Sequence, residues 1–296
     1  MSLLQEKLSL RARLLKLVGR QTWLPKGQDR LLRLIWPPDA KKSQEFEVDF
    51  FGKRYRGNLN HYIDWMVFCY GAAPHCELAL LDHMANRIRA VRGHVNFFDV
   101  GANVGHHTLF MADRADHVFA FEPLPRLQGL IADKIALNGL TNVQILPIGL
   151  GNQSGWFDYY PGIGANSGIG TFTTPNSADF GASVKLTVER GDDVIKKMGL
   201  PRVDLIKIDV EGFERRVLEG LSRTIQRDRP AILMELSGHS RNEFGDVSQL
   251  LNCLYDDAKI AQVNGRAGKG YVLSQFQYET SEEIIVVPGE FHGFVE

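Results

Sequence analysis

Beyond residue 93, short apolar runs alternate along the chain with stretches in which apolar residues recur at helical spacing. Short apolar runs of this kind are typical of strands, and the helical spacing is typical of amphipathic helices. Strands separated by helices form parallel sheets that helices cover on both faces. We therefore predict an α/β fold with a mostly parallel, doubly wound sheet, whose strands are Asn96–Val100, His117–Phe121, Val143–Ile148, Val203–Ile208 and Ala231–Leu236.

Helices are predicted between these strands and after them. One begins near Val104, a second covers residues 125–138, and a third covers residues 213–226. After Phe244 the pattern indicates one more helix and two final strands, of which the last is Glu283–Val287. This order of elements is that of a Rossmann-like sheet.

Residues 152–191 interrupt the alternation of strands and helices. They contain two predicted strands, Trp156–Tyr160 and Val184–Glu189, around a loop that is rich in Gly, Asn, Ser and Thr. Two strands around such a loop are typical of a β-hairpin. We interpret the segment as a β-hairpin insertion that could overhang a site on the sheet.

The chain before residue 93 follows a different pattern. Residues 3–18 place leucines at mixed three- and four-residue spacing, which predicts an amphipathic helix. The sequence then predicts a break at Pro37-Pro38, a hairpin over Phe46–Tyr55 and a helix over 75–91. The resulting division is an N-terminal helical and hairpin extension at 1–92 and an α/β domain at 93–296.

The net charge of -1 conceals an uneven distribution of charge. Residues 1–42 contain ten Lys and Arg against three Asp and Glu, so this arm carries +7 and the remainder -8. The first predicted helix places Arg11, Arg13 and Lys16 beside its leucines. Such a helix can pack on its own domain with a solvated basic face, or it can make a peripheral membrane contact with an anionic surface. The overall charge indicates no nucleic-acid partner.

Three cysteines, Cys69, Cys76 and Cys253, give neither a disulfide framework nor the spacing of a zinc site. A reducing, cytoplasmic location is therefore the default expectation. No window approaches 18 uninterrupted apolar residues, so we expect no transmembrane helix. The N-terminal leucines lack a continuous apolar core with a small-residue cleavage site, so we expect no signal peptide.

The first strand of the α/β domain ends in a turn that contains two glycines, Asp99-Val100-Gly101-Ala102-Asn103-Val104-Gly105. Glycines permit a tight turn and let a ligand approach the backbone amides at the start of the next helix. Such turns also contain glycines for packing alone, so the motif gains weight only from its surroundings.

The second strand ends at Glu122, which lies 23 residues after Asp99. A carboxylate at this place can reach both ribose hydroxyls of an adenosine-type ligand, although a glutamate there can also cap a helix. A dinucleotide site needs a glycine where Asn103 stands, because a side chain there crowds the pyrophosphate. Adenosylmethionine has no pyrophosphate, and its charged amino-acid end needs polar partners near the same turn. An NAD-dependent oxidoreductase is the alternative from another enzyme class.

Five stretches of the sequence, in this order along the chain, match the motifs of a single protein family. They are FFDVGANVGHHTLF (97–110), VFAFEP (118–123), LNGLTNVQILPIGLG (137–151), NSGIGTF (166–172) and VDLIKIDVEGFERRVLEG (203–220). Over about residues 93–237 the chain resembles the FkbM-type methyltransferases, a family of mainly O-methyltransferases. The resemblance implies a Rossmann-like class I methyltransferase fold and the cofactor S-adenosyl-L-methionine. It does not identify the acceptor.

The resemblance also implies which residues bind the cofactor. Those residues are Asp99, Gly101, Asn103, Gly105 and Glu122, to which we add Gly149, Asn166 and Glu211 as further candidates. The family suggests that the loop around Asn166 helps to close the site, but Asn-Ser-Gly is equally typical of a turn. His106-His107 departs from the family, where aromatic or small residues are more usual, and its relation to the ligand stays open.

Charged side chains follow the fourth and fifth strands. Alternation puts Lys207 and Asp209 on one face of the fourth strand. Glu211 follows in the next turn, Glu235 ends the fifth strand, and His239 lies in the polar turn beyond it. Ligands of open α/β sheets bind beyond the carboxyl ends of the strands, which makes Asp209, Glu235, His239 and Lys207 candidate catalytic residues. The two acids before the helix, Asp209 and Glu211, could instead cap it.

We predict methyl transfer from a sulfonium to a hydroxyl of a glycan, lipid or secondary metabolite. A non-catalytic adenosylmethionine-binding protein is the second alternative. Asp209 and Glu235 could share a divalent ion, because magnesium prefers oxygen ligands. Lys207 partly satisfies the Asp209 carboxylate, so we expect catalysis without a metal.

Overall fold

The sheet at the centre of the computed structural model has eight strands in the order β13-β12-β14-β11-β10-β3-β4-β5. The structure describes residues 8–21, 27–38, 43–72, 74–162, 170–172, 180–265 and 270–295. The strands from β11 to β5 run parallel, whereas β14, β12 and β13 join by antiparallel pairing. Their bounds are β3 Asn96–Val100, β4 His117–Phe121, β5 Val143–Leu146, β10 Leu205–Ile208, β11 Ala231–Glu235, β12 Lys259–Gly265, β13 Tyr271–Gln275 and β14 Glu283–Val287.

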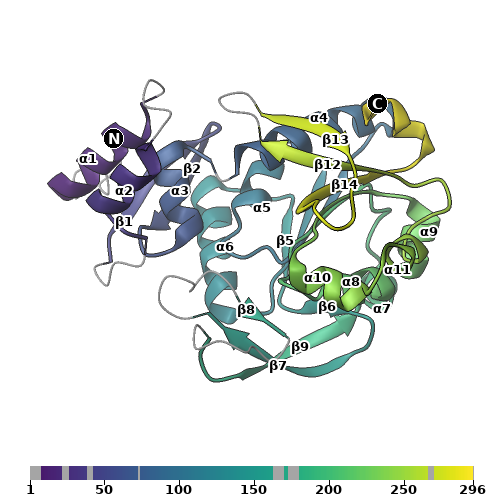
Figure 1. The fold of residues 1–296 in the computed structure, drawn as a ribbon. Coiled ribbons are helices and arrows are strands. Elements are labelled where there is room, and N and C mark those ends of the chain that lie inside the picture. The colour runs from purple at the N-terminus through teal and green to yellow at the C-terminus, as the bar shows by residue number, and fades with distance from the viewer. Residues whose placement is uncertain are drawn as a thin grey trace.

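Helices cover both faces of this sheet (Figure 1), and neighbouring residues in a strand therefore enter different cores. Phe97 belongs to one hydrophobic cluster and Phe98 to the other, as period-two geometry requires. The predicted doubly wound α/β fold is confirmed. The helices are α4 His75–Arg92, α5 His106–Met111, α6 Pro125–Asn138, α7 Gly191–Met198, α8 Glu214–Gly220, α9 Ser222–Asp228, α10 Gly238–Phe244 and α11 Val247–Asn252, followed by the 3-10 helix η2 Gly289–Phe294.

Two predictions about secondary structure were wrong. The single helix expected over 213–226 is broken at Leu221, which lies between α8 and α9 with its side chain in the core. The C-terminal region contains three strands rather than two, because β13 extends the sheet at its edge. The residues of β13 are mostly half-exposed or exposed, so their sequence carries little apolar signal.

The N-terminal elements pack beside the sheet rather than standing apart from it. They are α1 Leu10–Gly19, α2 Gln28–Ile35, β1 Glu45–Phe50, β2 Lys53–Asn58 and α3 Tyr62–Tyr70. Strands β1 and β2 form the predicted hairpin. Leu15 of α1 and Trp65 of α3 lie in the same hydrophobic cluster as Phe97 of β3. Figure 1 shows these elements next to α6, at the edge of the α/β region.

A second sheet contains the predicted insertion. Strands β7 (Gly155–Pro161) and β9 (Val184–Arg190) pair antiparallel, as expected of a hairpin. The sheet is larger than the prediction, because β6 (Gly149–Gly151) and β8 (Gly170–Thr171) join its two sides. Asn166 lies outside the described residues. Within the described part of the chain, no helix has the length and apolar character needed to cross a membrane.

Candidate active site

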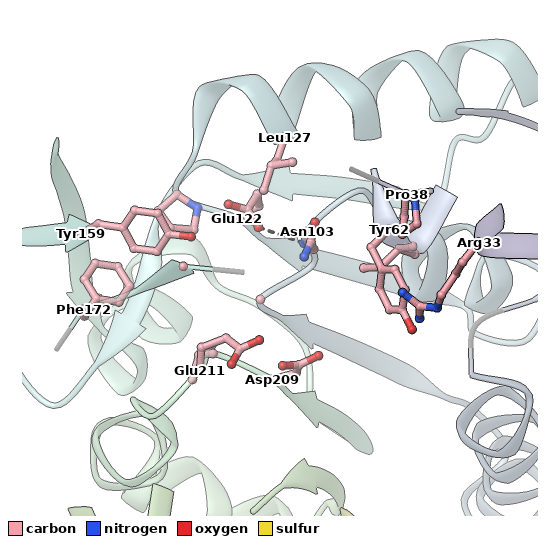
Figure 2. Close-up of a pocket in the computed structure, with 15 residues that line it drawn as sticks. Arg33, Pro38, Tyr62, Asn103, Glu122, Leu127, Tyr159, Phe172, Asp209 and Glu211 are labelled. Atoms are coloured by element: carbon pink, nitrogen blue, oxygen red, sulfur yellow. Dashed lines mark hydrogen bonds between the residues drawn. The ribbon is translucent and has the colours of Figure 1, made fainter. Parts of the chain in front are cut away.

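A cavity of about 480 Å³ lies beyond the carboxyl ends of β3, β4 and β10, where ligands of open α/β sheets bind. Three parts of the chain form its walls: the turns after these strands, the second sheet, and the N-terminal elements. Figure 2 shows Tyr159 and Phe172 on one side of the turn and Tyr62 and Arg33 on the other. The lining residues are Arg33, Pro38, Tyr62, Ile63, Gly101, Asn103, Glu122, Pro123, Leu127, Tyr159, Gly170, Phe172, Asp209, Val210 and Glu211.

The turn after β3 needs its glycines for close approach. Gly101 has φ +83°, and a Cβ there would overlap the carbonyl oxygen of Asp209. Gly105 has φ +77°, and a Cβ there would lie 2.8 Å from the side chain of Ile131. Asn103 also has a positive φ of 51°, a conformation that asparagine tolerates better than most residues. The first glycine therefore brings the turns after β3 and β10 into direct backbone contact.

Glu122 is held in the cavity by two backbone amides. Its Oε2 accepts a hydrogen bond from the Asn103 N–H at 2.9 Å, and its Oε1 accepts one from the Leu124 N–H at 2.9 Å. Burial raises the pKa of Glu122 to about 7, although the two amide hydrogen bonds oppose the shift. Each carboxylate oxygen keeps a second lone-pair direction, so the group is oriented to accept from two further donors such as ribose hydroxyls.

Not every predicted cofactor residue lines this cavity. Gly101, Asn103, Glu122 and Glu211 do, whereas Asp99, Gly105 and Gly149 are not among the lining residues. Asp99 is fully buried behind the turn, where its Oδ2 accepts a hydrogen bond of 2.6 Å from the Thr108 hydroxyl. Asp99 lies beside Lys207 in the register of the neighbouring strand β10. Its position indicates that it stabilises the turn after β3 rather than contacting a ligand in the cavity.

Lys207 and Asp209 form an ion pair at the end of β10. The Lys207 Nζ lies 2.7 Å from Asp209 Oδ2, and the lysine side chain is buried while the aspartate faces the cavity. Loss of solvent raises the pKa of Asp209, but the Lys207 ammonium more than offsets this and leaves that pKa below its ordinary value. Asp209 is thus an ionised carboxylate at neutral pH.

Three carboxylates converge at the ends of β10 and β11. One ligand oxygen from each of Asp209, Glu211 and Glu235 lies within 4.8 Å of the others. Burial and the neighbouring Asp209 carboxylate raise the pKa of Glu211 to about 7 and that of Glu235 to about 8. Glu235 Oε2 is buried without a hydrogen-bond partner. The spacing suits a divalent cation, and the raised pKa values equally suit carboxylates that exchange protons near neutral pH.

Glu214, which the sequence analysis did not single out, holds the turn that presents these acids. Its carboxylate is buried and accepts hydrogen bonds from the backbone N–H groups of Val210 and Gly212 and from the Ser240 hydroxyl. Glu214 thus holds the turn before α8, and the structure shows no side-chain capping hydrogen bond at the N-cap of this helix, Phe213. Glu211 is left facing the cavity at φ +55°, which is strained for a glutamate.

His239 is displaced from the cavity. It lies in the first turn of α10 with an exposed side chain, packs against Gly212, and does not line the cavity. Four further residues line the cavity that the sequence pattern did not predict: Tyr159 and Phe172 of the second sheet, and the N-terminal residues Arg33 and Tyr62. The abundance of aromatic residues in the 156–172 region could have indicated Tyr159 and Phe172. No local sequence pattern could have indicated that the N-terminal segment reaches the site.

Comparison with known proteins adds a family match over the same region. A family model described as a methyltransferase FkbM domain matches residues 99–258, just over half of the chain. The methyltransferase sdnD of Sordaria araneosa is 32% identical over 154 residues, which cover 42% of this chain and 59% of that relative. The hexuronic acid methyltransferase AglP of Haloferax volcanii is 28% identical over 170 residues, which cover 56% of this chain and 65% of that relative.

The match to each of these two relatives covers less than two thirds of its length. Among solved structures, the methyltransferase FkbM of Methylobacillus flagellatus superposes with a TM-score of 0.44 at 15% identity. That match covers 65% of this chain and 43% of the other.

Proposed function

Because the chain belongs to the FkbM methyltransferase family, we propose that it transfers a methyl group from S-adenosylmethionine to a hydroxyl oxygen of a glycan, lipid or secondary metabolite. One observation carries the proposal. A single cavity joins Glu122, which two backbone amides hold with lone pairs free for further donors, to the carboxylates Asp209 and Glu211, which can accept the proton of a hydroxyl.

The residues present fit adenosylmethionine. Glu122 would accept hydrogen bonds from the ribose, while Leu127, Tyr159 and Phe172 offer apolar and aromatic surface for the adenine. The carboxylates of the cavity favour a cationic sulfonium through their charge. Asn103 occupies the place where a dinucleotide site needs glycine, which argues against an NAD-dependent oxidoreductase.

When bound, adenosylmethionine supplies an activated methyl group. The chain's own residues hold the acceptor oxygen in line with it and take up the hydroxyl proton. Glu211 lines the cavity and has a pKa of about 7, near the working pH that suits a general base. Glu235, with a pKa of about 8, would still carry a proton at neutral pH and could hydrogen-bond to its neighbours. Asp209 stays ionised beside Lys207 and would orient the acceptor hydroxyl through a charge-assisted hydrogen bond.

Calorimetry with the purified protein tests the proposal. We expect adenosylmethionine and adenosylhomocysteine to bind and NAD not to bind. Preferential binding of NAD would favour the oxidoreductase alternative. Binding of adenosylmethionine without methyl transfer to any hydroxyl of a glycan, lipid and metabolite panel would favour a non-catalytic binding protein.

We also propose that the basic N-terminal helices bring the enzyme to an anionic membrane surface in the cytoplasm. Leu10 and Leu17 of α1 and Leu34 of α2 are 85%, 62% and 71% exposed, and arginines flank them, as in interfacial helices. The test is co-sedimentation with phosphatidylglycerol vesicles. The double variant Leu10→Ser/Leu17→Ser should sediment less than the unchanged protein, whereas equal sedimentation would exclude a membrane role for these leucines.

A further inference from the structure

A second cavity of about 330 Å³ lies beside the first and shares its floor. Gly101, Asn103 and Asp209 line both cavities, as do Tyr62 and Ile63 of the N-terminal region. A ligand that crosses the turn after β3 can therefore occupy the two cavities at once. The other residues around the second cavity are Met66, Pro74, Glu77, Ala102, His106, His107 and Lys207.

The polar wall of this second cavity is almost fully removed from solvent. Glu77, His107 and Lys207 have exposed fractions of 8%, 5% and 4%. Glu77 Oε2 lies 2.9 Å from His107 Nε2, and His106 Nε2 is buried without a hydrogen-bond partner. Buried polar groups destabilise a fold unless something satisfies them, so unmet donors and acceptors in a cavity indicate a polar ligand.

The charges on this wall have both signs. Burial and the Lys207 ammonium lower the pKa of His107, so its imidazole is neutral. Burial raises the pKa of Glu77 to about 7, because the nearby Lys207 only partly offsets the loss of solvent. A cation brought next to Glu77 would therefore stabilise its carboxylate. The wall combines a carboxylate that lacks a full cationic partner with a lysine and with the imidazole of His106, whose Nε2 has no hydrogen-bond partner.

We propose that the second cavity binds the amino-acid end of adenosylmethionine and that Glu77 accepts a hydrogen bond from its α-ammonium group. The inference rests on the proposed function, since it extends the same ligand from Glu122 across Gly101 and Asn103. The imidazole of His106 and the Lys207 ammonium would face the α-carboxylate, while His107 stays beside Glu77. A zwitterion is the ligand chemistry that matches a buried wall with charges of both signs.

The acceptor is a poorer match for this cavity. Glu211 lines only the first cavity, and Glu235 lines neither, so the second cavity lacks the carboxylates that neighbour Asp209. It is also walled by Met66, Pro74 and the first turn of α4, which leaves the acceptor side of the first cavity as the place for a large substrate.

The proposal gives the N-terminal region a direct part in cofactor binding. Glu77 belongs to α4 and lies outside residues 99–258, the part of the chain that the family model matches. The family motifs would then supply the adenosine half of the site. The preceding helix would supply the only carboxylate in the second cavity, among the described residues, that is not already paired with Lys207.

Binding measurements with two nucleosides distinguish the contribution of the amino-acid end from that of the adenosine. Adenosylhomocysteine carries the amino-acid end, whereas 5′-methylthioadenosine lacks it. We expect Glu77→Gln to weaken adenosylhomocysteine binding about ten- to hundredfold, the effect of losing a charged hydrogen bond, and to change methylthioadenosine binding less than about twofold. Asp82→Asn is the matched control, because Asp82 lies on the same helix and pairs with Arg114 away from the cavity.

Equal effects on both nucleosides, or no effect on either, would overturn the role of Glu77. A measurement on the unchanged protein covers the case in which Glu77→Gln does not fold. An adenosylhomocysteine analogue without the α-amino group should bind about tenfold or more weakly than adenosylhomocysteine, and equal affinity would overturn the proposal. If the unchanged protein binds neither nucleoside, the proposed function itself fails, which is a distinct result.

Discussion

The two sides of the first cavity hold their carboxylates in opposite ways. On the proposed cofactor side, each oxygen of Glu122 accepts a hydrogen bond from a backbone amide, and the group is fixed by the turn around it. On the proposed acceptor side, Asp209 and Glu211 line the cavity and Glu235 does not, yet one carboxylate oxygen from each of the three lies within 4.8 Å of the others. One oxygen of Glu235 has no hydrogen-bond partner. Backbone hydrogen bonds fix the Glu122 carboxylate in one orientation. On the other side, neighbouring carboxylates repel one another, and burial together with this repulsion raises the pKa of Glu235.

This difference separates two tasks. A ligand that must be held in one orientation benefits from groups that are already satisfied and cannot turn. A step that moves a proton benefits from groups whose charge changes easily near neutral pH. Perturbing one side should therefore change cofactor affinity, and perturbing the other should change turnover.

The largest expected effect comes from Asp209→Asn. The variant should change its affinity for adenosylhomocysteine far less than its turnover, which should fall about 10²- to 10⁴-fold, because the charge that orients the acceptor hydroxyl is removed. Calorimetry and a methyl-transfer assay measure the two quantities. Asp158→Asn is the control, since Asp158 pairs with Lys185 on the surface of the second sheet. Full activity of Asp209→Asn would remove Asp209 from the mechanism.

Glu122→Ala tests the other side and should have the next largest effect. Losing a charged acceptor should weaken adenosylhomocysteine binding about ten- to hundredfold, while turnover at saturating cofactor changes less. Glu45→Ala, at an exposed position in β1, is the control for a generic loss of a glutamate. An unchanged affinity would limit Glu122 to holding the Asn103 and Leu124 amides, and the two sides of the cavity would no longer divide the tasks.

The pH dependence of stability should report the repulsion on the acceptor side. Burial and the charges of Asp209, Glu211 and Glu214 raise the pKa of Glu235 to about 8, against the nearby Lys207, which lowers it. Glu235 is thus protonated in the fold and ionised in the unfolded chain above about pH 4.5. Its contribution to stability is complete below that pH and is lost as the pH rises through about 8.

We therefore expect the Tm of the ligand-free protein to fall by a few degrees between about pH 5 and pH 8. Glu235→Gln should flatten this slope, and differential scanning calorimetry measures it. Identical slopes for the two proteins would show that the acceptor-side carboxylates relieve their repulsion in another way, for instance by binding a cation from the buffer.

The smallest expected effect is that of a chelator. Lys207 already neutralises Asp209, and Glu235 carries a proton at neutral pH, so we expect turnover to be unchanged by EDTA and by added magnesium. Activity abolished by EDTA and restored by magnesium would instead make Asp209, Glu211 and Glu235 a metal site. In that case hydrogen bonds would hold the Glu122 carboxylate, and a metal ion would hold the carboxylates of Asp209, Glu211 and Glu235.

The sequence revealed the cofactor side better than the acceptor side for a physical reason. Strands β3 and β4 are almost entirely buried, so they are short and mostly apolar, and Gly101 and Glu122 follow directly at their ends. The edge strand β13 is half-exposed and gave no such run. The break between α8 and α9 occurs at an apolar residue, Leu221, that fits a helix pattern.

The remaining parts of the site depend on contacts between distant segments. Glu214 holds the turn after β10 partly through the hydroxyl of Ser240, which lies 26 residues further along the chain. The sequence does not show that these two residues are in contact. Arg33 and Tyr62 reach the cavity because the N-terminal elements share a hydrophobic core with the sheet, a long-range arrangement that no local pattern records. The predicted base His239 is close in sequence to Glu235, yet the start of α10 turns it outward.

The contact between Gly101 and the carbonyl of Asp209 sets a rule for redesign and for evolutionary drift. Lengthening or reshaping the loop after β10 should also disturb the loop after β3, the proposed cofactor loop, because the two backbones are in direct contact. Substitutions that change the substrate range are instead expected at side chains that line the cavity but are not part of this contact, such as Arg33, Tyr62 and Phe172. A library for altered substrate range should therefore diversify those positions and leave 209–212 intact.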